Sequence, residues 1–499
     1  MKSSAKTDPT PPEHTNGARH VVVAGGGLAG IACAVRLAEN GVRVTLIEAS
    51  RRLGGRAGSH EDPETGETLD NCQHVTMAAC TSYLDLLGRL GKRQAMRWTV
   101  EQCWLMPPLV GPDGVRVEVP RPKPSIVKPD SLPAPLHLAG SLLGAGFLSK
   151  REAWSVAQAS RRLMSTDRSE HAHETFGDWL RSQGQHPGVV ERFWEPIVVS
   201  ACNLTCDRVA ASVAMHVFQE GLFASVGASA IGIPSVPLSE LYGGVAERLE
   251  QAGGAVRLGA RVASVGNHAV RLSDGERLDA DAVVCALPLA STLKLVDPEA
   301  RDERFDGLDR IGFSPIAGIH LEFDRPVLPR PHAVLLGTPT QWVFRKDEAG
   351  RRVHAVASAA EAWVERGASA AVERAVADLR LHLPAMQDAE LVWGKAVLEK
   401  RATFAATPEA EALRPAVTGP SGLLLAGDWV RTGWPATMEG ATRAGYAAAA
   451  AVLRLDPARL IPEPRPIARL PRLLGLRFPP DTLREVGASA TSEPATARV

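Results

Sequence analysis

The hydrophobic pattern near the start of the chain predicts a strand, a helix and a second strand in direct succession. A β-branched apolar run at 20–24 is typical of a buried strand, and residues 28–40 follow with helical spacing as far as Gly41. Another apolar run occupies 42–47. Glycines and Arg36 interrupt the apolar stretch, so a βαβ unit explains it better than a membrane-spanning helix.

The pattern farther along the chain predicts a second domain that interleaves with the first. Many prolines between 107 and 135 precede amphipathic helical spacing through Gln219, and an α/β pattern returns between 238 and 287. That part predicts a helix at 238–251 and strands near 256–258, 261–265 and 282–286; a strand at 422–428 and an alanine-rich helix at 438–453 follow. The predicted fold class is therefore α/β, a Rossmann-like domain interleaved with a mixed α+β domain. The expected boundaries are a disordered leader at 1–17, a nucleotide-binding domain at 18–100, 236–300 and 415–455, a substrate domain at 101–235 and 301–414, and a Pro/Arg-rich tail at 456–499.

Composition narrows the classes of function. The 499 residues carry 56 basic and 56 acidic side chains, so nothing global indicates a nucleic-acid partner. Seven scattered cysteines without a CxxC pair predict neither a disulfide framework nor a metal site, and reduced thiols fit a cytoplasmic protein. The polar segment 1–17 lacks the apolar core of a signal peptide.

A glycine-rich loop between the first strand and the first helix predicts a dinucleotide site. Gly25, Gly27 and Gly30 form G-x-G-x-x-G, and Leu28 and Ala29 begin the helix whose amide groups would meet a pyrophosphate. The first glycine permits the tight turn, the second the close approach of the phosphates, and the third the packing of helix on strand.

The second strand and the segment after it favour FAD. Glu48 ends that strand, where its carboxylate can accept hydrogen bonds from a ribose diol and repel a 2′-phosphate. Residues 48–56 read E-A-x-x-R-x-G-G-R, in which two further glycines allow backbone to approach a cofactor and the arginine can hold a pyrophosphate. From this segment we predict cofactor contacts by Glu48, Ala49, Arg52, Gly54, Gly55 and Arg56.

With these motifs the chain resembles the flavin amine oxidase and phytoene desaturase superfamily. The resemblance implies the interleaved fold predicted above and a backbone contact from Val262 to the adenine. It also implies that Gly427 and Asp428, in the segment Leu-Ala-Gly-Asp, meet the ribityl or pyrophosphate region. The remaining implied contacts lie at a helix start facing the flavin: Pro435, Ala436, Thr437 and Met438. Asp428 has a structural alternative as a plain helix-capping or turn residue.

Within that superfamily, residues 69–75 (Leu-Asp-Asn-Cys-Gln-His-Val) resemble the D-N-G-Q-H motif of hydroxysqualene dehydroxylases, with Cys72 in place of the glycine. Further matches lie at 193–196, 237–243 and 341–344, and the resemblance spans about 20–453. It implies reductive removal of an allylic hydroxyl from hydroxysqualene or a similar long isoprenoid alcohol, which requires an acid near the oxygen, an apolar tunnel and a hydride from reduced flavin. The candidate catalytic residues are His74 and Asp70, with Gln73 and Tyr242 behind them. Each has an alternative structural role: His74 as a buried polar residue, Asp70 as a turn cap and Tyr242 in packing.

Partners and rival functions follow from what else the sequence contains. The sequence shows one dinucleotide loop and no second one for NADPH, so we expect the flavin to be reduced by a separate electron donor or by NAD(P)H that binds transiently. The run 465–478 alternates arginines with apolar residues, which fits contact with an anionic membrane surface or a strap on the protein itself. A carotenoid-type desaturase, an amine oxidase and a non-catalytic prenyl-lipid carrier remain alternatives; the retained cofactor motifs disfavour the carrier.

Overall fold

A parallel five-stranded sheet organises the part of the protein that contains the predicted βαβ unit; the computed structural model describes residues 19–108 and 123–483. Its strand order is β10 (Ala255–Leu258), β2 (Arg43–Glu48), β1 (His20–Ala24), β14 (Ala282–Cys285) and β20 (Leu424–Leu425). The predicted βαβ unit is present, with α1 (Leu28–Glu39) between β1 and β2. The strand expected at 422–428 has only two paired residues. Gly427 and Asp428 follow the paired residues and are not part of the strand.

The strand expected near 261–265 belongs to another sheet. It is β11 (Val262–Val265), which pairs antiparallel with β12 (Ala269–Leu272), while β12 pairs with β13 (Arg277–Asp279). The helix expected at 238–251 is interrupted: a 3-10 turn at Leu238–Tyr242 ends before Gly244, whose φ of 89° breaks the helical path, and α9 runs from Val245 to Gln251. Apolar spacing continues across this break, so the pattern could not reveal it.

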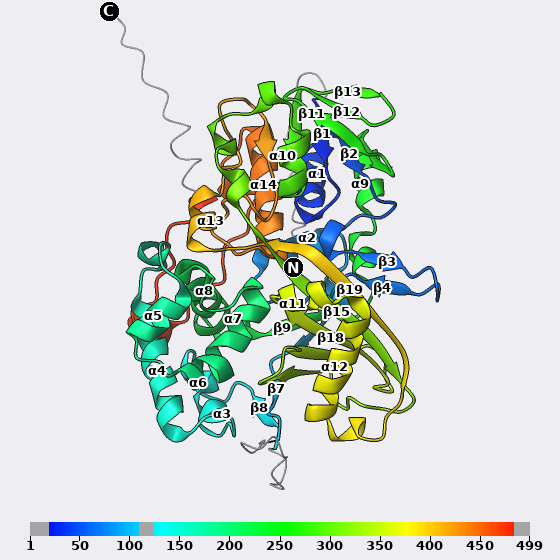
Figure 1. The fold of residues 1–499 in the computed structure, drawn as a ribbon. Coiled ribbons are helices and arrows are strands. Elements are labelled where there is room, and N and C mark those ends of the chain that lie inside the picture. Colours follow the sequence, from blue (N-terminus) through cyan, green and yellow to red (C-terminus); the bar gives the residue numbers. More distant parts are fainter. Residues whose placement is uncertain (1–18, 109–122, 484–499) are drawn as a thin grey trace, which may run out of the picture.

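The helices α1 and α14 (Met438–Leu453) pack closely against each other beside the parallel sheet. The alanine-rich α14 lies against α1, and a side chain at Gly445 would come within 2.2 Å of the Ala29 carbonyl oxygen. Small residues at this contact let the two helices approach closely, and both helices therefore start at the same region of the sheet. Figure 1 shows α1, α10 (Leu289–Leu295) and α14 together in the upper part of the molecule, with α2 (Thr81–Arg89) below them.

A seven-stranded, mostly antiparallel sheet forms the lower right part in Figure 1. The order is β19 (Leu391–Phe404), β15 (Phe313–Phe323), β18 (Arg352–Ser358), β17 (Trp342–Arg345), β16 (His332–Leu335), β7 (Gln102–Leu105) and β8 (Ser125–Val127). Its strands β7 and β16, which pair in parallel, come from the two separate segments predicted to form the substrate domain. The helices α11 (Glu361–Arg366) and α12 (Ala368–His382) pack on β15 and β19.

Helices, most of them short, form the lower left part in Figure 1. They are α3 (Ala139–Leu143), α4 (Lys150–Ser165), α5 (Phe176–Ser182), α6 (Pro187–Val189), α7 (Glu195–Cys202) and α8 (Ala211–His216), with a π-helical turn at Val217–Phe223 and a short α15 (Arg469–Leu473). Small sheets link the parts: β3 (Ser59–Glu61) with β4 (Thr68–Asp70), and β5 (Thr76–Met77) and β6 (Met96–Thr99) with β9 (Ile231–Pro234). Within 19–108 and 123–483, no helix has the length and hydrophobicity required to cross a membrane.

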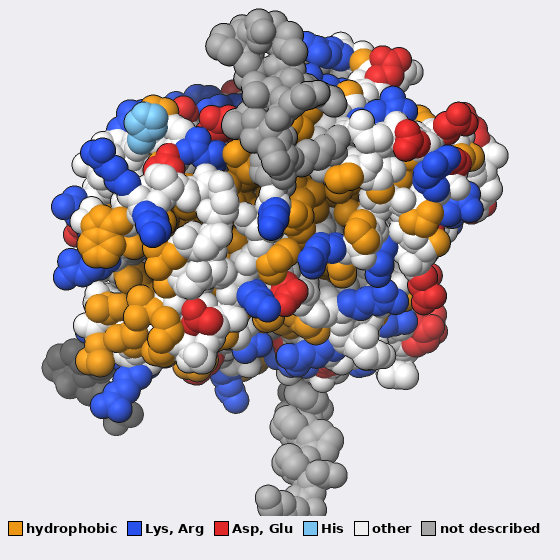
Figure 2. All heavy atoms as spheres, turned by 90° about the horizontal axis from the view of Figure 1, so that it is seen from below, with side chains coloured by type: hydrophobic (Ala, Val, Ile, Leu, Met, Phe, Trp, Pro, Cys, Tyr) orange, Lys and Arg blue, Asp and Glu red, His pale blue; other side chains and the backbone are white. Residues whose placement is uncertain are grey.

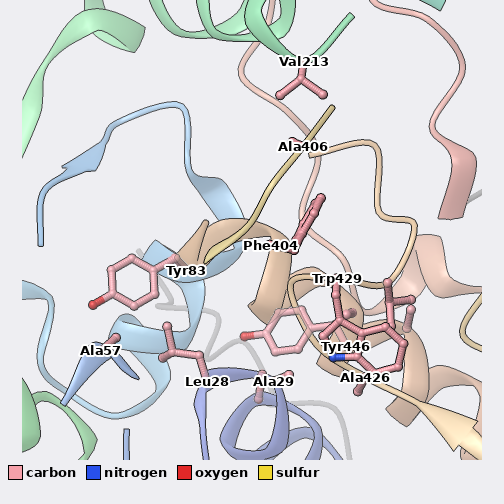
Figure 3. Packing of buried hydrophobic residues seen from close by; sticks show 14 of the residues in the cluster. Leu28, Ala29, Ala57, Tyr83, Val213, Phe404, Ala406, Ala426, Trp429 and Tyr446 are labelled. Atoms are coloured by element: carbon pink, nitrogen blue, oxygen red, sulfur yellow. The ribbon is translucent and has the colours of Figure 1, made fainter. Parts of the chain in front are cut away.

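The largest apolar core joins these parts. Leu28 and Ala29 of α1, Tyr446 of α14, and Phe404 at the end of β19 belong to one buried cluster. Figure 3 shows these residues together with Trp429, which follows β20. Because one core contains residues of α1, α14 and β19, the ends of these elements are held in fixed positions around the space between the two sheets.

Candidate functional site: a dinucleotide cavity that continues toward buried histidines

One cavity of about 790 Å³ opens at the carboxyl ends of β1 and β2. This is the edge at which open parallel sheets bind ligands, and the volume lies in the range of small-molecule sites. All the predicted cofactor contacts except Gly30 and Arg52 line it: Gly25, Gly27, Leu28, Ala29, Glu48, Ala49, Gly54, Gly55, Arg56, Val262, Gly427, Asp428, Pro435, Ala436, Thr437 and Met438.

The glycines of the loop have separate physical roles. Gly25 has φ of 111°, and a side chain there would lie 2.5 Å from the Ala286 carbonyl oxygen. A side chain at Gly30 would collide with the Gly25 carbonyl oxygen at 1.8 Å, so this residue packs helix on strand and does not line the cavity. At Gly27 a side chain would meet no protein atom within 4 Å and would project into open space beside the α1 N-terminus. That open space is where a pyrophosphate would lie.

The carboxylate of Glu48 is fixed by backbone amides. Its Oε2 accepts a hydrogen bond from Gly26 N at 2.8 Å, and its Oε1 accepts one from Ser50 N at 2.7 Å. Each carboxylate oxygen keeps a further lone pair for a ribose hydroxyl. Two more backbone bonds, from Ala260 N to the Glu48 carbonyl and from Gly259 N to the Ser50 carbonyl, hold the start of β11 beside it. Val262 is therefore close to the predicted ribose position.

Arg56 and Asp428 form an ion pair in the cavity lining. Arg56 Nη2 lies 2.6 Å from Asp428 Oδ1, and Arg56 Nη1 donates to the Ala402 carbonyl at 2.8 Å. Burial lowers the pKa of the guanidinium, but the pairing with Asp428 outweighs it and the pKa lies above its ordinary value. A charged, oriented guanidinium with donors still available fits a doubly charged pyrophosphate.

The N-terminus of α14 supplies another positive dipole end. Thr437 caps it by accepting a hydrogen bond from Gly440 N at 3.1 Å, and residues 435–438 face the cavity. A helix of 16 residues directs its free amides at this point and favours negative charge there. The cavity thus contains a carboxylate that can bind a ribose. Exposed backbone amides and a cation can bind phosphates, and a second helix N-terminus can face a negatively charged ring. These are the groups that FAD requires.

Residues 71–75 of the segment 69–75 line the cavity beyond the groups that would bind the nucleotide. Asp70 itself does not line the cavity. The Asp70 carboxylate is buried and accepts hydrogen bonds from Ser59 Oγ at 2.8 Å and Leu238 N at 3.0 Å, and it pairs with Lys346 Nζ at 3.3 Å. Lys346 Nζ also donates to Gln73 Oε1 at 3.0 Å. Asp70 is therefore placed to hold the segment in position, whereas Gln73 lies in the lining.

His74 faces the cavity with one ring nitrogen engaged. Its Nδ1 lies 3.0 Å from the Cys72 carbonyl oxygen, so Nδ1 carries the proton and Nε2 is the nitrogen left for a ligand. Burial lowers the pKa of the imidazole, so the ring is neutral near pH 7.

Cys72, the one departure from the resembled motif, also lines the cavity. Its φ is not positive, so the backbone at this position does not require glycine. Burial raises the pKa of its thiol to about 12, which keeps the thiol protonated. The thiol packs with Phe344 and Val356, and its presence makes the wall of the cavity bulkier than glycine would.

Two predicted site residues have contacts outside the cavity. Tyr242 is buried, donates from its hydroxyl to the Ala57 carbonyl at 2.8 Å, and lies over Gly54, where a side chain would come within 2.5 Å of its ring. Its position supports the Gly54–Gly55 turn. Arg52 points away from the cavity and pairs with the exposed Glu61 at 3.3 Å.

Sequence reasoning missed other polar residues of the lining. His216, at the end of α8, faces the cavity and packs edge-on against Trp434 with ring centroids 4.4 Å apart. Burial lowers the pKa of His216 well below its ordinary value, and Glu220 Oε1 lies 3.3 Å from its Nδ1. Its sequence neighbours are apolar and carry no motif. Glu439 was within the recognised helix start; its carboxylate accepts from Ser82 N and Tyr83 N at the start of α2, so it joins α14 to α2.

Comparisons with known proteins agree with this architecture. Residues 28–453 match the family described as flavin containing amine oxidoreductase. Hydroxysqualene dehydroxylase from Sinorhizobium fredii is 27% identical over 460 residues, covering 86% of this chain and 97% of that protein. The 15-cis-phytoene desaturase of Capsicum annuum is 24% identical over 482 residues, covering 91% and 80%. An oxidoreductase structure from Methanosarcina mazei superimposes with a TM-score of 0.63 at 18% identity, covering 87% of this chain and all of that one, which shows the shared fold.

The family match covers most of the chain, and the cavity presents the groups that FAD requires. The protein is an FAD-dependent oxidoreductase and belongs to the flavin containing amine oxidoreductase family.

Proposed function

We propose that the protein catalyses the reductive dehydroxylation of hydroxysqualene, or of a similar long isoprenoid alcohol, to the corresponding hydrocarbon. The observation that carries the proposal is the placement of the 71–75 segment in the wall of the flavin cavity, with His74 Nε2 available to a ligand. The alignment with the hydroxysqualene dehydroxylase relative includes 97% of that protein's length. Apolar neighbours of His74 in the lining, Val75, Met77 and Ile316, suit a hydrocarbon.

The reaction exchanges a hydroxyl for a hydride: the alcohol, one proton and one hydride give the hydrocarbon and water. Reduced FAD, when bound, supplies the hydride. Ionisation of an allylic C–O bond requires that its oxygen be protonated and that water be kept from the resulting cation. The residues of the chain must therefore provide an acid and a dry wall.

His74 is suited to the role of acid. The Cys72 carbonyl retains the Nδ1 proton, so a proton taken up by the ring is held at Nε2, toward the cavity. Because burial lowers its pKa, the protonated ring is the minor form near pH 7, but it is the stronger acid and transfers its proton readily to a hydroxyl oxygen. Asp70, Gln73 and Lys346 would act behind it by fixing the loop.

We further propose that a separate donor, of a chemistry the sequence does not identify, reduces the flavin, and that the strap 465–478 contributes peripheral membrane contact through which a water-insoluble alcohol arrives. Arginines 469, 472 and 477 are exposed on this strap. The same strap also packs on the protein, since Arg465 Nε donates to the Ala78 carbonyl at 2.5 Å and Leu476 is buried.

The proposal is tested by anaerobic mixing of photoreduced protein with hydroxysqualene. We expect the flavin to reoxidise and squalene to form in equal amount. Absence of reoxidation, together with bleaching of the oxidised protein by a polyene, would assign the chain to desaturation, as in the phytoene desaturase relative. Bleaching by an amine would assign it to amine oxidation. A colourless protein that takes up no FAD would instead point to a lipid carrier.

A further inference from the structure

Helix α4 presents a basic face to solvent. Its N-terminus is capped by Ser149, and its buried side is formed by residues at helical spacing such as Val156 and Leu163. The opposite face exposes four cationic residues: Lys150, Arg151, Arg161 and Arg162. Within α4, which the structure describes in full, the one acidic residue is Glu152, and it is engaged with the Ser149 cap and with Arg192 at 2.5 Å. The exposed face is therefore uniformly positive.

Large apolar side chains project from the same part of the molecule. Trp154, on the exposed face of α4 between the two basic pairs, is 65% exposed. Leu143, at the end of the adjoining α3, is 57% exposed, and Leu136 just before α3 is 46% exposed. Single exposed apolar residues are common on protein surfaces, but a tryptophan and leucines grouped within one basic surface are characteristic of segments that insert at a membrane interface.

The C-terminal strap extends this surface. Gly475 lies against the C-terminal end of α4, where a side chain would come within 3.2 Å of Ser165. Leu473, beside it, is 75% exposed and is flanked by the exposed Arg472 and Arg477. The strap is held in place because Ala468 N donates to the Ala224 carbonyl at 2.8 Å. Figure 2, which views the molecule from below, shows hydrophobic side chains gathered on the left part of this face with Lys and Arg around them.

We propose that the exposed face of α4, together with Leu143 and the adjoining strap, docks on an anionic lipid bilayer. A phosphodiester surface neutralises the four cations of α4, and the interfacial layer below it accommodates Trp154 and Leu143. Nucleic acid would satisfy the positive charge but would leave these apolar side chains exposed. The proposal extends the contact proposed for 465–478 to a second element, and it does not depend on which reaction the flavin site performs.

Vesicle flotation of the full-length holoprotein tests the proposal. We expect binding to vesicles that contain phosphatidylglycerol, weak binding to pure phosphatidylcholine, and loss of binding at high salt. Each cation near such a surface contributes about fivefold in partition, so Arg161→Glu combined with Arg162→Glu should reduce binding by about 25-fold or more. Trp154→Ser should reduce binding to the anionic vesicles without changing its salt dependence.

Matched controls come from the opposite parts of the molecule. Arg271→Glu and Val392→Ser alter exposed residues of β12 and β19, elements that lie apart from α4 in Figure 1, and should leave binding unchanged. Bound flavin and the circular dichroism spectrum report that each variant is folded. Undiminished binding of the α4 variants overturns the proposal even when Leu473→Ser abolishes binding, because the contact would then belong to the strap alone. Equal binding to neutral vesicles, no binding to any vesicle, or equal loss in the Arg271→Glu control also overturns it.

Discussion

Arg56 and Asp428 lie 372 positions apart in the sequence and meet through a 2.6 Å ion pair in the wall of the flavin cavity. Arg56 follows the two glycines after β2 and Asp428 follows β20, so the pair joins segments whose strands are separated in the sheet by β1 and β14. Asp428 is nearly buried and Arg56 is partly exposed toward the cavity. The carboxylate orients a cation that lines the cavity and keeps further N–H donors.

We expect Arg56→Ala to weaken FAD binding by about 10- to 100-fold, because a hydrogen bond to a charged group contributes about 1.5–3 kcal/mol. The apoprotein should also lose stability, since Asp428 would be left buried without its partner. Fluorescence titration of apoprotein with FAD measures the first effect, and thermal unfolding of the apoprotein measures the second. Arg52→Ala is the control: this exposed side chain pairs with Glu61 outside the cavity, so the affinity should not change. A weakened affinity in Arg52→Ala would mean that the loop rearranges on binding.

The loop glycines allow cofactor binding to be separated from folding. Gly27→Ala should leave apoprotein stability nearly unchanged because its side chain would enter open space, but it should reduce FAD affinity strongly by occupying that space. Gly25→Ala should destabilise the apoprotein by at least about 1–2 kcal/mol because of its positive φ, with an added clash against Ala286. Denaturant titration and FAD titration of both variants check the difference. If both variants lost stability equally, the open space at Gly27 would not exist in solution.

The nucleotide end of the cavity could be predicted from the sequence because its chemistry resides in backbone. Gly25, Gly27 and the start of α14 act through turns, amides and helix ends, and these follow from short local motifs. Glu48 was recognised because it ends a strand directly after such a motif. Residues that act through local backbone geometry leave a signature in local sequence.

The other end of the cavity could not be predicted in the same way. His216 reaches the lining only because α8 packs beside Trp434, a contact between residues far apart in the sequence. Asp70 was proposed as a catalytic candidate, but three partners that no spacing rule foretells, Ser59, Leu238 and Lys346, draw its carboxylate away from the cavity lining. The roles of Asp70, Gln73, His74 and Tyr242 in catalysis stay predictions.

The two cavity histidines should respond differently to replacement. His74→Gln should reduce the rate of squalene formation by about 10²–10⁴-fold if His74 is the acid, with FAD affinity and the flavin spectrum little changed. His216→Gln should have a smaller effect on the rate, because His216 is packed against Trp434 beside the buried Glu220. Single-turnover reoxidation of the photoreduced protein measures both variants. The reverse order of effects would identify His216 as the acid.

Buried neutral histidines should make the fold sensitive to mild acid. Burial lowers the pKa of His320 and of His332 to about 4 and places those of His216 and His354 well below the ordinary value. Since unfolded histidines titrate near pH 6.5, the unfolded chain takes up protons below that pH that the folded chain does not. The free energy of unfolding therefore falls as pH decreases from about 6.5 toward about 4, with a slope for each such histidine that approaches about 1.4 kcal/mol per pH unit about one unit below pH 6.5.

Urea titrations between about pH 7 and about pH 5.5, above the range where most carboxylates protonate, measure this slope. His332→Phe is the matched variant, because the ring is buried beside Trp342 and Phe344, with centroids 5.7 and 6.0 Å away, and an aromatic hydrocarbon suits that position. It should lower the slope by about 0.8 kcal/mol per pH unit on average over this range, since the unfolded histidine takes up about 0.6 proton there. A slope identical to that of the natural protein would show that His332 is protonated, or exposed to solvent, in the folded state.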